Sequence, residues 1–170
     1  MNKDRIIIPP EKREVEGPMI FLAGPIKGSE RWQEVAMEYI HEIDPNIYLA
    51  SPRRVLDRQK DFTQEMYNEQ VDWETEYLNR CAREGAIIFW LASEKEHYCE
   101  RPFAQTTRFE LAEWKVKHEN TGANLVIGIE DGFTNHRYIK RRFSQDCPEV
   151  PFFTDLKSTC LKAVELAKQK

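Results

Sequence analysis

The sequence predicts an α/β protein, a doubly wound three-layer sandwich with a mostly parallel five-stranded sheet, of the flavodoxin-like or Rossmann-like type. Short apolar runs, typical of strands covered on both faces, alternate along the chain with segments of helical periodicity. The length of 170 residues also matches one domain. Because strands that alternate with helices form parallel sheets through right-handed crossovers, we expect helices on both faces of the sheet.

The first half of the chain predicts two strands, each followed by a helix. Residues 19–23 form a continuous apolar run that ends at Gly24-Pro25, as expected for a buried strand. Apolar residues then recur at helical spacing, with Ser29 as the N-cap of this helix. The second strand is expected at 47–50, and a long helix over about 63–85.

The second half of the chain contains the strongest strand signal, residues 86–91. This segment is short, apolar throughout and bounded by Gly85 and the polar residues 93–96, which favours a central strand. The elements expected after it are a helix at 107–118, a strand at 125–129, a short edge strand at 150–153 and an amphipathic helix at 156–168.

Composition and charge are those of a globular domain and argue against nucleic-acid or membrane partners. Hydrophobic residues make up 41% and charged residues 32% of the chain, and 25 Lys and Arg against 29 Asp and Glu give a net charge of -4. No apolar run approaches the ~20 residues that span a bilayer, and the N-terminus lacks a signal-peptide core. We expect one cytoplasmic domain over residues 1–170, with residues 1–18 as an N-terminal arm.

The cysteines and histidines show no spacing typical of a metal site or a disulfide framework. The sequence has no CxxC pair and no HExxH motif, so we expect reduced cysteines and no metal ion. It also lacks a GxSxG elbow, which argues against a serine hydrolase.

Ligands of doubly wound folds bind beyond the carboxyl ends of the strands, so the loop after residue 23 is a candidate site. Gly24 and Gly28 permit close approach of a sugar or phosphate to the backbone at a helix N-terminus. The loop matches neither GxGxxG nor GxxxxGK[ST], which argues against dinucleotide or triphosphate binding. An ordinary tight turn remains the alternative.

Glu74 is a candidate acid or base because it falls inside the apolar stripe of the long helix. At ~100° per residue it is the one charged residue in that stripe, whereas Asp72 projects to the polar side. Burial would raise the pKa of an inward carboxyl towards values useful for proton transfer. The alternative is a buried salt bridge to a neighbouring arginine.

Glu110 stands near the expected start of the helix that follows the central strand. Thr107-x-x-Glu110 fits a capping box, in which the threonine and the glutamate satisfy free backbone N–H groups. A carboxylate at a helix N-terminus is also kept ionised by the helix dipole, which is the state that a nucleophile needs.

A run of basic residues between His136 and Arg142 is interpreted as a solvated face.

Five segments in series resemble the nucleoside 2-deoxyribosyltransferase family in order and spacing, over about residues 19–153. They are Ile20-Phe21-Leu22-Ala23-Gly24-Pro25-Ile26, Val71-Asp72-Trp73-Glu74, Ala86-Ile87-Ile88-Phe89-Trp90-Leu91, Thr106-Thr107-Arg108-Phe109-Glu110-Leu111 and Ile127-Gly128-Ile129-Glu130-Asp131-Gly132-Phe133. The chain departs from the family's pattern where Phe21 replaces a common tyrosine, and where no aspartate lies between Pro102 and Arg108.

This resemblance implies transfer of 2-deoxyribose between nucleobases, with no metal or organic cofactor. It implies that Glu110 is the nucleophile and that an acidic residue on the preceding helix assists the base, for which the apolar stripe favours Glu74 over Asp72. The substrate-binding residues that it implies are Gly24, Pro25, Ile26, Asp72, Trp73 and Thr107.

Two other functions stay open on the sequence. One is an N-glycosidase that hydrolyses a nucleoside or a nucleoside 5′-monophosphate, with Ser29, Lys27 or the basic run holding the phosphate. The other is a nucleotide-binding module without turnover. In each case the partner is a small nucleoside or nucleotide. We also expect a homo-oligomer, with interfaces at Trp73, Tyr98, Phe103 and Trp114 if these side chains are exposed.

Overall fold

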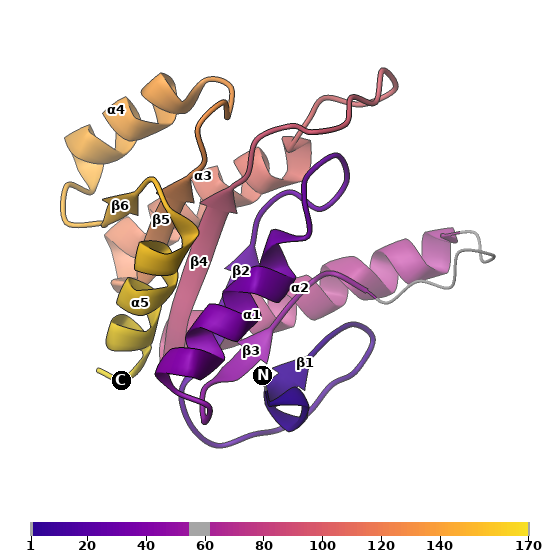
Figure 1. Ribbon diagram of the computed structural model, residues 1–170, viewed down its shortest axis with the longest axis vertical. Coiled ribbons are helices and arrows are strands. Elements are labelled where there is room, and N and C mark those ends of the chain that lie inside the picture. The colour runs from indigo at the N-terminus through magenta and orange to yellow at the C-terminus, as the bar shows by residue number, and fades with distance from the viewer. Residues whose placement is uncertain (1, 55–61, 170) are drawn as a thin grey trace.

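The structure, a computed structural model, describes residues 2–54 and 62–169 as a single six-stranded sheet with helices on both faces (Figure 1). The strand order is β1-β3-β2-β4-β5-β6, and every adjacent pair in it is parallel. The strands are β1 (Ile6–Ile7), β2 (Met19–Ala23), β3 (Tyr48–Ala50), β4 (Gly85–Leu91), β5 (Leu125–Ile129) and β6 (Phe152–Phe153). The predicted doubly wound α/β fold is confirmed.

Helices form the two outer layers. They are α1 (Trp32–Ile43), α2 (Gln64–Glu84), α3 (Gln105–Thr121), α4 (His136–Asp146) and α5 (Leu156–Ala167), and a short 3-10 turn, η1 (Lys3–Arg5), precedes β1. Helices α1 and α5 cover one face of the sheet, and α2 and α3 cover the other (Figure 1). Each outer layer therefore has its own apolar core.

Alternation along the central strands feeds these two cores. On β4, Ile87 and Phe89 pack towards α2 and α3, whereas Ile88 and Trp90 pack towards α1 and α5. All seven residues of β4 are buried. Burial on both faces explains why the strand reads as a continuous apolar run rather than as alternating apolar and polar residues.

The prediction of five strands is wrong because the N-terminal arm contributes a sixth. Strand β1 pairs with β3 at the sheet edge, where Ile6 lies opposite Leu49 and Ile7 is fully buried. Two residues are too few to show a strand period, and Pro9-Pro10 follows immediately, so the pattern indicated only a short apolar stretch.

The basic run lies on α4, where Arg137, Lys140, Arg141 and Arg142 are exposed, so its interpretation as a solvated face is confirmed, and α4 packs on the domain through the buried Phe143. One expectation for a helix end needs correction, because Ser29 does not cap α1 and the N-cap is Arg31. The hydroxyl of Ser29 donates instead to the carbonyl oxygen of Pro25, 2.7 Å away. Among the described residues, no helix is long and apolar enough to cross a bilayer.

The direction of winding reverses between β2 and β4. Strand β2 is followed by α1 and leads to β3 on one side, whereas β4 is followed by α3 and leads to β5 on the other side. The loops that leave the carboxyl ends of β2 and β4 therefore separate to opposite faces of the sheet. This is the position at which open α/β sheets bind their ligands.

Candidate active site

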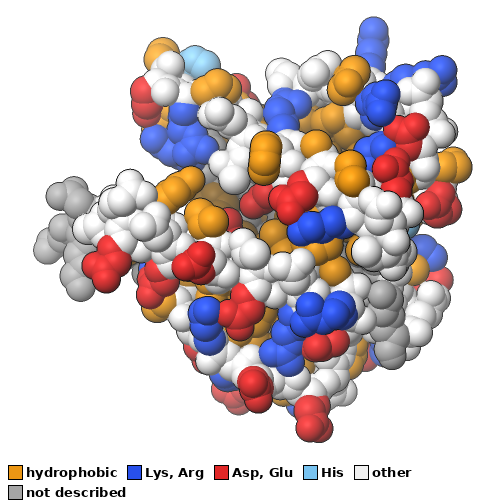
Figure 2. Space-filling model, turned by 180° about the vertical axis from the view of Figure 1, so that it is seen from behind, with side chains coloured by type: hydrophobic (Ala, Val, Ile, Leu, Met, Phe, Trp, Pro, Cys, Tyr) orange, Lys and Arg blue, Asp and Glu red, His pale blue; other side chains and the backbone are white. Residues whose placement is uncertain are grey.

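A pocket of about 420 Å³ lies at this switch point. Its walls are the loop after β2, the end of β3, the first half of α2 and the first turns of α3. Figure 2 shows this face hollowed between the projecting start of α2 and the segment that follows β4. Of the predicted site residues, the pocket brings together Glu74, Glu110, Gly24, Pro25, Ile26 and Thr107.

Glu74 enters the pocket from α2. Helix α2 begins where the hydroxyl of its N-cap, Thr63, accepts a hydrogen bond from the N–H of Met66, and it presents Glu74 four residues after Gln70. Burial raises the pKa of the Glu74 carboxyl, against the hydrogen bond from Gln70 and the attraction of Arg54. Among the described residues Glu74 forms no salt bridge, so the alternative of a buried ion pair has no support.

A chain of hydrogen bonds fixes how Glu74 is oriented. The Arg54 Nε–H donates to Gln70 Oε1 over 2.6 Å, which turns the amide nitrogen of Gln70 towards Glu74. That nitrogen donates to Glu74 Oε1 over 2.7 Å and to the carbonyl oxygen of Pro52 over 2.9 Å. Because Oε1 already accepts a hydrogen bond, a proton on Glu74 is best placed on Oε2.

Glu110 enters the same pocket from α3, and the predicted capping box is absent. Helix α3 begins at Gln105 after Ala104, a left-handed N-cap with φ of 56°, so Thr107 is a buried residue inside the first turn. Glu110 consequently lies in the second turn, where its side chain does not serve the helix end. The sequence pattern fits a capping box with Thr107 as N-cap, but the observed N-cap is Ala104, three residues earlier.

The pKa of Glu110 is raised to about 8, chiefly by burial and next by the nearby carboxylate of Glu74. The expectation that the helix dipole keeps Glu110 ionised is therefore wrong. No hydrogen bond or ion pair to Glu110 exists within residues 2–54 and 62–169. Glu110 therefore retains a proton near neutral pH, and two carboxyl groups in one pocket, one of which raises the pKa of the other, are suited to acid and base chemistry.

The loop after β2 is fixed close to the sheet. A Cβ on Gly24 would lie 2.3 Å from the carbonyl oxygen of Trp90 and 2.6 Å from the ring of Trp32. The indole N–H of Trp32 donates to the Pro25 carbonyl over 2.9 Å. Gly24, Pro25 and Ile26 thus form a rigid wall of the pocket. The backbone at residue 24 lies so close to Trp90 and Trp32 that only glycine fits there.

Two predicted substrate-binding residues lie outside the pocket. Trp73 is fully buried between Phe21 and Tyr77, and its indole N–H donates to the carbonyl of Glu11 over 2.6 Å. Asp72 is exposed on the opposite side of α2, as its helical phase predicts. Phe21, by contrast, reaches the floor of the pocket.

The sequence indicated Lys27 as a candidate phosphate ligand, and Lys27 does line the pocket. Sequence reasoning missed the arginines of the lining, Arg53, Arg54 and Arg101. Arg53 and Arg54 lie shortly after the end of β3, at the carboxyl edge of the sheet, and this position was the signal available in the sequence. The basic run on α4 is not part of this lining. Nor do three or more His, Cys, Asp or Glu side chains among the described residues gather to hold a metal ion.

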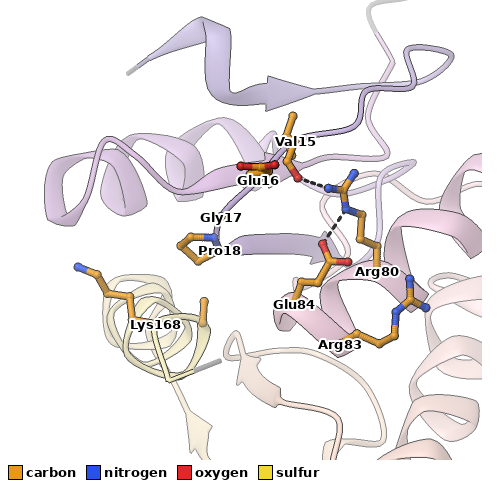
Figure 3. A pocket seen from close by; sticks show the side chains of 9 residues that line it. Val15, Glu16, Gly17, Pro18, Arg80, Arg83, Glu84 and Lys168 are labelled. Carbon is orange, nitrogen blue, oxygen red and sulfur yellow. Dashed lines mark hydrogen bonds and ion pairs between the residues drawn. The ribbon is translucent and has the colours of Figure 1, made fainter.

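A second cavity, of about 680 Å³, lies at the opposite edge of the sheet, between the N-terminal arm and the ends of α2 and α5 (Figure 3). Arg80 spans it, donating to the carbonyl of Val15 and pairing with Glu84 at 2.9 Å. This cavity lies at the amino ends of the strands, and its central arginine holds the arm in place. Of the two described glutamates that line it, Glu16 and Glu84, the second is paired with Arg80, in contrast to Glu74 and Glu110.

Comparison with known proteins supports the fold alone. The chain matches no known protein family, and no curated protein sequence matches it. A crystal structure of a conserved protein from Enterococcus faecalis V583 superposes with a TM-score of 0.52 at 16% identity. The match covers 91% of this chain and 99% of that one, so the architecture is shared over nearly the whole length.

Proposed function

We propose that this site cleaves the N-glycosidic bond of a 2-deoxynucleoside and transfers the 2-deoxyribose to a second nucleobase through a covalent glycosyl-glutamate. The observation that carries the proposal is the convergence of Glu74 and Glu110 in one pocket at the switch point of the sheet. Glu110 is the nucleophile, and Glu74 is the general acid and base. The resemblance of the sequence to nucleoside 2-deoxyribosyltransferases supports the same assignment.

In the first half-reaction the bond between C1′ and the base nitrogen breaks, and its electron pair leaves with the base. Glu74 donates a proton to a ring nitrogen of that base, and a carboxylate oxygen of Glu110 forms a bond to C1′. In the second half-reaction the incoming base attacks C1′, Glu74 removes its proton, and the bond to Glu110 breaks. The two glutamates end the cycle as they began.

This mechanism requires one proton on the pair, placed on Glu74. The pKa of both carboxyl groups is raised, so the pair holds a proton near neutral pH. In the protein alone, burial favours that proton on Glu110, with a pKa of about 8. A basic ring nitrogen beside Glu74 Oε2 would draw the proton to that side, leaving Glu110 ionised for attack.

Product identity tests this proposal. We expect the protein, incubated with a deoxynucleoside and a second free base, to form the second deoxynucleoside, detected by chromatography. Release of only free base and 2-deoxyribose would identify a hydrolase. Binding without release of base across a panel of nucleosides and nucleotides would identify a non-catalytic module.

The nucleophile is tested by mapping a trapped intermediate. Denaturing the enzyme during turnover and digesting it should place the added sugar mass on the peptide that contains Glu110. Glu113, on the same helix but exposed, provides a matched control, because Glu113→Gln should leave the adduct intact. An adduct on Glu74 would reverse the two roles.

We also propose that the chain forms a homo-oligomer in the cytoplasm. Trp73 and Trp114 are buried, so the condition under which they were expected at an interface is not met. Phe109 and Val116 support an interface on α3 instead, since they are 74% and 52% exposed. The mass of the protein in solution tests this, and a fully active monomer would contradict it. Cys81, Cys147 and Cys160 are buried and unpaired, in keeping with a reducing compartment.

A further inference from the structure

The charges in the pocket differ in sign from those of the whole protein. The chain carries a net charge of -4. Nevertheless, among the described residues, the charged side chains that line this pocket are the cationic Lys27, Arg53, Arg54 and Arg101 and the acidic Glu74 and Glu110. The proposed cleavage of an uncharged nucleoside uses the two carboxyl groups. It does not require the additional positive charge. The excess indicates that part of the ligand is an anion.

Two of these cations are already neutralised by carboxylates of the protein. Lys27 pairs with Glu100 at 3.1 Å, and Arg54 pairs with Glu69 at 2.7 Å. Arg54 additionally holds Gln70, as described above. These contacts explain Lys27 and Arg54 as structural residues and leave Arg53 and Arg101 to be explained.

Arg53 is held in place entirely by neutral groups. Its Nε–H donates to Oε1 of the buried Gln33 over 3.0 Å, and its Nη2 donates to the carbonyl oxygens of Ile26 and Glu30 over 3.2 and 3.3 Å. Within the described part of the chain no carboxylate forms an ion pair with Arg53. The nearby Glu34 is itself paired with Arg31 at 2.5 Å. The guanidinium is therefore oriented but not neutralised.

The donors of Arg53 that remain free are those of Nη1. A guanidinium has five N–H donors, of which Nε supplies one and Nη2 supplies two. Both Nη2 hydrogens have carbonyl acceptors, and no acceptor for Nη1 lies among the described residues. Arg53 is half-buried, and this burial lowers its pKa from the ordinary arginine value. The positive charge of Arg31 lowers the pKa of Arg53 further, by a smaller amount. An anionic ligand in the pocket would supply acceptors for Nη1 and neutralise this half-buried charge.

We propose that Arg53 forms a phosphate subsite, so that the substrate of the proposed reaction is a nucleoside 5′-monophosphate. Nη1 contacts the phosphate, on the wall of the pocket formed by the loop after β2 and the end of β3. Arg101, which is exposed and has no side-chain partner among the described residues, adds positive charge on the same pocket. Arginine suits this role because its planar donors match phosphate oxygens.

The inference rests on the proposed function for the sugar and base, but its test does not need turnover. Calorimetry compares binding of a deoxynucleoside, its 5′-monophosphate and 2-deoxyribose 5-phosphate to the wild-type protein. We expect the monophosphate to bind at least tenfold more tightly than the nucleoside. The sugar phosphate should also bind measurably, because the phosphate contact does not depend on the base. Equal affinity for nucleoside and monophosphate would overturn the subsite.

The variant Arg53→Gln assigns the preference to this residue. It should lose the preference for the monophosphate while its affinity for the nucleoside stays within about twofold of wild type. Arg137→Gln removes the same charge from an exposed position of α4 and should keep the full preference. Arg53→Lys retains the positive charge but not the planar donors, so this variant should retain part of the preference for the monophosphate. Full preference in Arg53→Gln, with an unchanged melting temperature, would refute the role of Arg53.

The outcomes separate the two proposals. Phosphate-dependent binding without release of base would leave the subsite standing and refute the proposed reaction. If base is released and the nucleoside binds as tightly as its monophosphate, the proposed reaction would stand and the phosphate subsite would be refuted. Failure of all three ligands to bind would refute both.

Discussion

Replacing Glu110 by glutamine should make the protein more stable at alkaline pH while it abolishes turnover. The pKa of Glu110 rises from 4.5 to about 8 on folding, mainly through burial and then through Glu74. Because the folded-state pKa is the higher one, the native state retains a proton that the unfolded state releases. Stability from this group is thus fully present below about pH 4.5 and is lost as the pH rises through about 8.

The size of the effect follows from the two pKa values. At about 1.4 kcal/mol for each tenfold change, a rise from 4.5 to about 8 corresponds to an upper bound of roughly 5 kcal/mol of lost stability. Part of this belongs to the coupled Glu74, so we expect a gain of a few kcal/mol for Glu110→Gln at pH 9. At pH 4.5 the gain should be small, because the folded state is then protonated and the unfolded state is still half protonated.

Urea unfolding at pH 4.5, 7 and 9 measures this difference. The free energy of unfolding of Glu110→Gln relative to wild type should increase with pH across the three values. Glu113→Gln, the exposed control on the same helix, should show a much weaker trend, since the charge of Glu113 is the smallest of the three causes that raise the pKa of Glu110. A difference between wild type and Glu110→Gln that is the same at pH 4.5 and pH 9 would refute the raised pKa, and wild-type turnover in that variant would refute its role as nucleophile.

Three further perturbations test the neighbouring groups. Glu74→Gln should slow natural substrates by ~10²–10⁴-fold and substrates with activated leaving groups much less, while the exposed Asp72→Asn should be nearly silent in the same rate assay. Gln70→Leu removes the hydrogen bond that lowers the pKa of Glu74, so the pH profile of kcat/KM should shift towards higher pH, and an unshifted profile would argue against this positioning role. Gly24→Ala should lower the melting temperature and the activity together, because the added Cβ meets the carbonyl oxygen of Trp90 at 2.3 Å, and an unaffected variant would show that this loop is not rigid.

The sequence predicts the central sheet well because burial on both faces leaves a direct mark on it. Strands β2, β4 and β5 read as uninterrupted apolar runs, and each is buried along its whole length. The inward phase of Glu74 on α2 was also predictable, since helical geometry fixes which residues share a face.

The features that the sequence did not reveal depend on tertiary contacts. The pairing of β1 with β3 joins segments that are about forty residues apart, and a two-residue strand has no period of its own. The start of α3 is set by a left-handed Ala104, an unfavourable conformation for alanine that no local rule predicts. Likewise, the gathering of Arg53 and Glu110 in one pocket depends on strand order, which brings the ends of β2, β3 and β4 together.

The N-terminal arm is bound to α2 largely through its backbone, beside one exposed ion pair between Lys12 and Glu76. Trp73 donates to the carbonyl of Glu11, the N–H of Arg13 donates to the hydroxyl of Tyr77 over 2.8 Å, and Arg80 donates to the carbonyls of Arg13 and Val15. Substitutions at exposed side chains of the arm should therefore be tolerated, whereas Ile7, which is part of the core, should not be. Deleting residues 2–16 would instead leave three donors of α2 without acceptors in a largely buried setting. The same helix carries Glu74, so the segment ahead of the first central strand helps to fix the position of the proposed general acid.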